Sequence, residues 1–80
     1  MLHYPFNPVT TIKFDIRTPG NVSMKAFDVL GREVAVLADE YLRVGSYERV
    51  FEASNLSSGV YYYTLRAVEF EKTLRMVVVR

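Results

Sequence analysis

Apolar and polar residues alternate along most of this chain with the period of a β-strand. Within residues 10–17, the apolar residues Ile12, Phe14 and Ile16 occupy every second position and charged residues lie between them. Because successive side chains of a strand point to opposite faces, this pattern predicts a strand with one buried face. Similar patterns predict strands over residues 46–53, 60–67 and 72–80. Residues 68–71, which include Phe70, are expected to be a hairpin connection, and the last strand is expected to turn Leu74, Met76 and Val78 into the core. No segment shows a convincing helical period.

A β-hairpin predicted over residues 22–37 organises the rest of the chain. Val22, Met24 and Ala26 form the apolar face of its first strand. Asp28 suits the first position of a type I turn, because its carboxylate can accept hydrogen bonds from the following N–H groups. Gly31 suits the last position, where the chain passes through positive φ.

Three other glycines mark expected turns. Gly20 follows Pro19 in the order that a type II turn requires. Gly45 is expected to form a turn after residues 38–44, which are interpreted as a strand end and a crossing segment with Leu42 turned inward. Gly59 ends a loop over residues 54–59.

Two aromatic segments give more specific expectations. Arg49 falls on the same face as Tyr47 and Phe51, so it should lie on an edge strand or be paired with a carboxylate. Alternation places Tyr61 and Tyr63 in the core. Tyr62 then stands outside, and the adjacent exposed aromatic is expected to be Tyr41.

The spacing of the strands predicts an all-β protein, a sandwich of six to seven short antiparallel strands. The 80 residues form one domain, residues 1–80. Residues 1–8 are expected to be an extended lead-in, with Phe6 placed against one end of the core.

Composition excludes several functions. Cysteine is absent, so disulfides and thiolate metal sites are excluded, and a net charge of +1 gives no general reason to bind nucleic acid. No apolar run approaches the roughly 20 residues that span a bilayer. The first residues lack the pattern of a signal peptide, so the chain either stays inside the cell as written or is a piece of a longer exported protein.

No group of residues predicts catalysis, a cofactor site or a metal site. His3 is the one histidine and has no orienting partner nearby in the sequence. Ser57 and Ser58 lie in a loop without a strand-to-helix elbow, so a turn is favoured over a nucleophile. The acidic pairs Asp39/Glu40 and Glu69/Glu71 fall in predicted turns without calcium-loop spacing, which favours solvated charges.

Five segments, in order, resemble the type A sorting domain of the type IX secretion system. They are residues 5–14, 27–34, 45–47, 55–65 and 72–80. The chain differs from that family in having Arg17 and Arg43 where proline is usual, and Arg49 where an inward aliphatic residue is usual. The resemblance covers essentially the whole chain.

The resemblance implies an immunoglobulin-like sandwich, related to one in the flagellar hook-capping protein. It also implies a role at the C-terminus of an exported cargo protein. Such domains fold in the periplasm, are recognised by the outer-membrane translocon and are commonly removed by a sortase-like peptidase. The cargo then reaches the cell surface or the medium.

We therefore expect a non-catalytic sorting and anchoring module. The alternative is a structural or adhesive sandwich that associates through exposed edge strands. The candidate recognition surface combines the last strand with adjoining loops. Its basic residues are Lys72, Arg75 and Arg80. Strict alternation turns Lys72 and Arg80 inward, near the strand ends where their charges reach water, and turns Arg75 outward.

Overall fold

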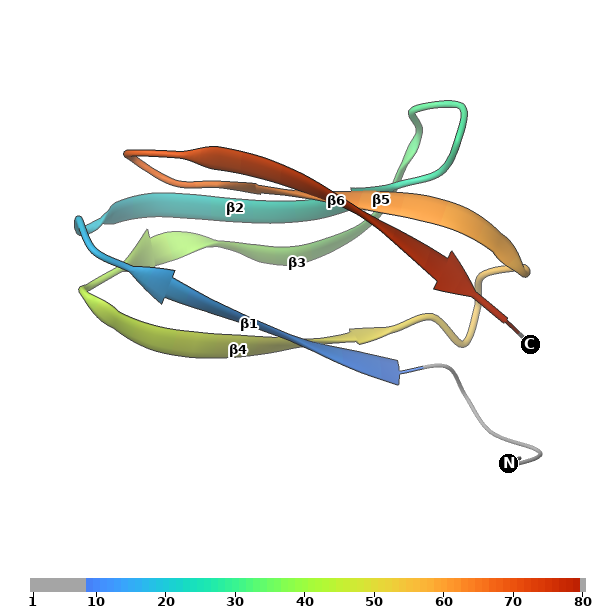
Figure 1. Ribbon diagram of the computed structural model, residues 1–80, viewed down its shortest axis with the longest axis horizontal. Helices are drawn as coiled ribbons and strands as arrows, with labels where there is room; N and C mark the ends of the chain where they lie inside the picture. Colours follow the sequence, from blue (N-terminus) through green and yellow to red (C-terminus); the bar gives the residue numbers. More distant parts are fainter. Residues whose placement is uncertain (1–8, 80) are drawn as a thin grey trace.

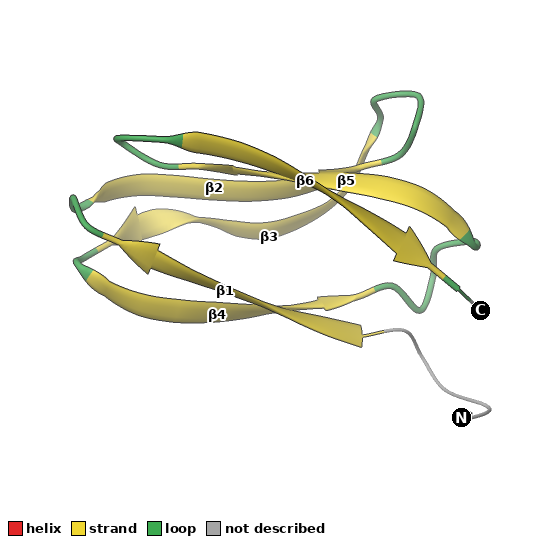
Figure 2. Ribbon diagram, in the orientation of Figure 1, coloured by secondary structure: helices red, strands yellow, loops and turns green. Residues whose placement is uncertain are grey.

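The protein, described here from a computed structural model over residues 9–79, is a sandwich of two antiparallel sheets (Figures 1 and 2). Its strands are β1 (Val9–Ile16), β2 (Gly20–Phe27), β3 (Glu33–Leu42), β4 (Gly45–Glu52), β5 (Gly59–Arg66) and β6 (Glu71–Val78). One sheet pairs β1 with β4, and the other has the order β3-β2-β5-β6. The predicted all-β class and the six strands are confirmed. The lead-in over residues 1–8, with Phe6, lies outside the described residues.

The core lies between the inner faces of the two sheets. The alternation in β1 and β2 is confirmed, because all six of their alternating apolar side chains are buried. The other buried apolar residues are Ala38, Leu42, Phe51, Ala53, Tyr61, Leu65 and Val78. Within residues 9–79, no helix is long and apolar enough to cross a membrane.

The strand β3 corrects one expectation from the sequence. It runs without a break from Glu33 to Leu42, so the crossing segment and the turn at Asp39 and Glu40 were wrong. Its pairing with β2 has two irregularities, between Met24 and Lys25 and between Ala26 and Phe27. These interrupt the alternation of inward and outward positions along β3, so its sequence lacks the regular pattern of a strand. Leu42 is buried, as predicted.

The turn at Gly20 also differs from the prediction. Gly20 does not have positive φ, which a type II turn would require, and it is the first residue of β2. A glycine is needed for a different reason. A Cβ at this position would overlap Cγ2 of Val68, on the turn between β5 and β6. The absence of a side chain therefore lets the two turns pack together.

The two long sides of the sandwich differ. On one side, β3 and β4 are joined by a short turn and are in contact. On the other side, β1 and β6 are the edge strands of their sheets. In Figure 1 the red β6 passes in front of β5, and the blue β1 passes in front of β4, so both edges face the viewer.

Candidate functional site

A groove lies along the edge of β1 that faces away from β4. One part encloses about 200 Å³ between Ile12 and Phe14 of β1 and Tyr63, Leu65 and Leu74 of the larger sheet. A second part of about 280 Å³ adjoins it at the end of β1, and Phe70 lines both. The groove thus follows β1 along most of its length.

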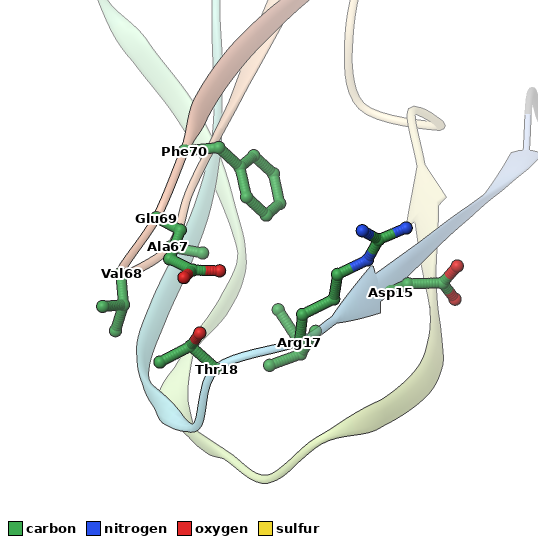
Figure 3. Close-up of a pocket in the computed structure, with 8 residues that line it drawn as sticks. Asp15, Arg17, Thr18, Ala67, Val68, Glu69 and Phe70 are labelled. Carbon is green, nitrogen blue, oxygen red and sulfur yellow. The ribbon is translucent and has the colours of Figure 1, made fainter.

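The floor of this groove is apolar and incompletely covered. Leu74 pairs with Tyr63 on the inner face of the larger sheet, yet its side chain is 39% exposed. Phe70 is 40% exposed, and Figure 3 shows its ring turned into the cavity. The reason is the strand number, because a sheet of two strands cannot cover a sheet of four. The predicted inward direction of the Leu74 side chain is confirmed, but the prediction that it is buried in the core was wrong.

Basic side chains border the groove. Lys13 and Lys72 line its first part and Arg17 lines its second, where Figure 3 shows the guanidinium extending from the end of β1. Among residues 9–79, none of these three forms an ion pair. The cations that do form ion pairs are Lys25, Arg32, Arg49 and Arg66.

The opposite side of the sandwich is closed by Arg49. Its guanidinium donates to the Glu40 carboxylate at 2.7 Å and to the backbone carbonyl of Glu48 at 2.7 Å. It also lies 5.9 Å from the centre of the Tyr47 ring. The prediction of an edge-strand arginine paired with a carboxylate is confirmed, and the ion pair joins β4 of one sheet to β3 of the other.

The structure separates the basic residues that the sequence analysis grouped together. Lys72 pairs with Leu65 on the inner face of the sheet, and its side chain is exposed beside the groove. Arg75 pairs with Tyr62 on the outer face. They therefore cannot belong to one flat surface. Arg80 lies outside the described residues.

The adjacent residues Tyr61 and Tyr62 point to opposite faces of β5, as predicted. Tyr61 is buried and its hydroxyl donates to the carbonyl of Ser57 at 2.8 Å, whereas Tyr62 is exposed. The neighbour of Tyr62 across β2 is Phe27, so the expected contact with Tyr41 was wrong. Gly45 and Gly59 are the first residues of β4 and β5.

The loop between β2 and β3 is held by Asp28. One carboxylate oxygen accepts hydrogen bonds from the N–H groups of Leu30 at 2.9 Å and Arg32 at 3.0 Å, and the other accepts from Arg32 Nε at 2.8 Å. Gly31 has φ +82° and donates its N–H to the Asp28 carbonyl. The hydrogen bond from the backbone of Arg32, together with that residue's side chain, lowers the pKa of the Asp28 carboxyl.

None of the described residues suggests a catalytic centre. No group of three or more His, Asp or Glu side chains within residues 9–79 could hold a metal ion. Glu40 and Glu71 are each engaged in an ion pair. His3 lies outside the described residues. The groove has the shape of a binding site, and its apolar floor with basic side chains at its border suits an extended apolar and acidic ligand.

Sequence reasoning missed the groove. Phe70 lies in the hairpin connection between β5 and β6, as predicted, but its place in a groove was not expected, and Leu74 was expected to be buried in the core. Both positions depend on which strands cover β6, and that depends on pairing between distant segments. A sheet count of two against four is not encoded in any local pattern.

Comparison with known proteins assigns the family. A family model described as the secretion system C-terminal sorting domain matches residues 3–80. The chain belongs to this family. The sorting domain is that of the type IX secretion system, as the sequence resemblance predicted. No curated protein and no solved structure matches the chain.

Membership of the sorting-domain family carries two general statements. The domain interacts with the type IX secretion machinery, and the cargo of such a domain is secreted to the cell surface or beyond it. The family match supports the role of a sorting signal for this chain.

Proposed function

We propose that this domain is a non-catalytic sorting and anchoring module that directs an attached cargo protein through the type IX system to the cell surface or the medium. The observation that carries the proposal is the family match over residues 3–80. The cargo would precede the domain and would cross the periplasm in transit. The partners would be the outer-membrane translocon and a sortase-like peptidase.

The fold supports recognition of a folded surface rather than a linear peptide. The buried apolar residues of the core come from all six strands, so no single linear stretch contains them. An unfolded chain would not place Lys13 of β1 and Lys72 of β6 along the same groove. Recognition should therefore be lost when the sandwich unfolds, even if every residue is still present.

The test is export of a reporter protein. Residues 4–80 are fused behind a periplasmic reporter in a strain with a working type IX system. We expect the reporter at the surface or in the medium. Deletion of residues 76–80 should abolish export, because Val78 is a buried anchor of β6 and is lost together with part of the edge strand.

A second candidate function is a structural or adhesive subunit that associates through an edge strand. The observation in its favour is the smaller sheet, in which both strands are edge strands. Retention of a folded, intact fusion in the periplasm would contradict sorting and favour this alternative.

A further inference from the structure

We propose that the groove beside β1 is a strand-addition site. It receives an extended segment of a partner protein with apolar side chains at alternate positions and carboxylates between them. The partner is a component of the machinery that recognises this domain, so the inference rests on the proposed function and names the surface through which recognition occurs.

One backbone edge of β1 has no partner strand among the described residues. Among residues 9–79, the strand β1 pairs only with β4, so the backbone groups on its other edge face the groove. Its eight residues contain no proline, so the N–H and C=O groups of alternate residues that point away from β4 can all take part in a new ladder. An unprotected edge of this kind is the usual site at which an extended peptide adds to a sheet.

The inner face of β6 has open space above it. A strand added to β1 would lie about 4.8 Å from it, which is the ordinary spacing in a sheet. That position is over Leu74 on the inner face of β6 and over Phe70, the residue before this strand, which remain 39% and 40% exposed. Alternate side chains of the added strand would cover both residues. The smaller sheet would then have three strands facing the four strands of the larger sheet.

The charged side chains that line the groove are mostly basic. Lys13, Arg17 and Lys72 line the groove without an ion pair among the described residues. Two carboxylates also line the groove, Asp15, which accepts a hydrogen bond from the Ser46 hydroxyl at 2.8 Å, and Glu69. The three cations outnumber them, so the lining keeps a net positive charge. The charge of the groove therefore favours a segment with carboxylates over one with basic side chains.

The edges of β3 and β4, on the opposite side of the sandwich, fit a partner strand less well. The β3 edge belongs to a strand with two pairing irregularities, which disfavour further pairing. The side that β3 shares with β4 is closed by Arg49 and Glu40. A second copy of this chain, added symmetrically at β1, would bring its own overhanging β6 into the space occupied by the first. A single extended segment has no such conflict.

The direct test uses isotope-labelled domain and a synthetic peptide. The peptide is as long as β1, eight residues, with glutamate and valine alternating and both ends blocked. We expect saturable shifts of backbone amide signals confined to residues 11–17 and the inner face of β6. A matched peptide with lysine in place of glutamate should bind about tenfold more weakly.

Variants of β6 supply matched controls on a single strand. Leu74→Glu and Lys72→Glu change the groove, and each should weaken binding of the acidic peptide about fivefold or more. Val77→Glu and Arg75→Glu make the same changes on the outer face, where Val77 pairs with Val60 and Arg75 with Tyr62. These two variants should bind like the parent. Melting curves establish that all four variants are folded.

The outcomes separate this inference from the proposed function. Shifts at another edge, equal binding of both peptides, or no binding would overturn the strand-addition site. Concentration-dependent shifts at β1 without peptide would assign the edge to a second copy and also contradict it. In the export assay, if the Leu74→Glu and Lys72→Glu fusions are exported as well as the parent fusion, the groove is not the recognition surface, although the domain is still a sorting signal. A parent fusion that stays in the periplasm would contradict sorting, while the peptide result still decides the groove.

Discussion

The guanidinium of Arg49 on β4 donates to the carboxylate of Glu40 on β3 at 2.7 Å, and this contact links the two sheets on the side of the sandwich opposite the groove. The side chain of Arg49 is 27% exposed and that of Glu40 is 46% exposed. At this exposure a single ion pair contributes little on its own. The Tyr47 ring near the guanidinium adds a second interaction.

We therefore predict a modest coupling between Arg49 and Glu40. Arg49→Met keeps the apolar stem and removes the charge, and Glu40→Gln removes the partner charge. A double-mutant cycle measured by chemical denaturation should give about 0.5–1 kcal/mol. Additive effects of the two substitutions would show that the ion pair does not stabilise the sandwich.

A second prediction concerns the contact between Gly20 and Val68. Gly20→Ala places a Cβ where Cγ2 of Val68 now lies, so it should lower the free energy of unfolding by about 1–2 kcal/mol. Val68→Ala removes the obstructing methyl group and should restore most of that loss in the double variant. If Val68→Ala fails to rescue Gly20→Ala, the close approach of the two turns is not the reason for the glycine.

Gly31 tests backbone conformation without a steric contact. No heavy atom lies within 4 Å of a Cβ built at this position, but φ is +82°. Gly31→Ala should therefore lower the free energy of unfolding by more than about 1 kcal/mol, whereas Gly31→Asn should cost less because asparagine tolerates this region better. An unchanged denaturation midpoint for Gly31→Ala would contradict the turn geometry.

The Asp28 carboxylate should make stability depend on pH. Its pKa in the folded protein is lowered, mainly by the hydrogen bond from the backbone N–H of Arg32. Its contribution is therefore present above the unfolded pKa of about 3.9 and is lost as the pH falls through the lower folded value. Denaturation midpoints measured from pH 7 to pH 2 should show the parent and Asp28→Asn converging at acid pH. A constant difference between them across this range would exclude the carboxylate as the cause.

The loop at Asp28 and the groove at Phe70 show what the sequence can and cannot predict. Asp28 and Gly31 lie close together in the chain, and the hydrogen bonds that shape their loop are formed within it. Local residue types were therefore sufficient. The covering of Phe70 depends on which distant strand lies over β6, and no local pattern contains that information.

Gly20 and Tyr62 illustrate the same limit. Gly20 was assigned to a type II turn because it follows a proline, but its role depends on Val68, which belongs to a different hairpin. The neighbour of Tyr62 depends on β2 pairing with β5, which no short-range signal specifies. The alternation in β1 predicted its buried face correctly, because burial of one face is a property of the strand itself.

The central claim is that this folded domain is a sorting signal. The most direct measurement is the fraction of a periplasmic reporter, fused to residues 4–80, that reaches the surface or the medium. It is measured in a strain with a working type IX translocon and in a matched strain without one. A Met24→Asp fusion serves as the unfolded control, because Met24 is fully buried. The account predicts export only when the translocon is present and the domain is folded. Retention of the folded parent fusion in the periplasm of the competent strain would contradict it.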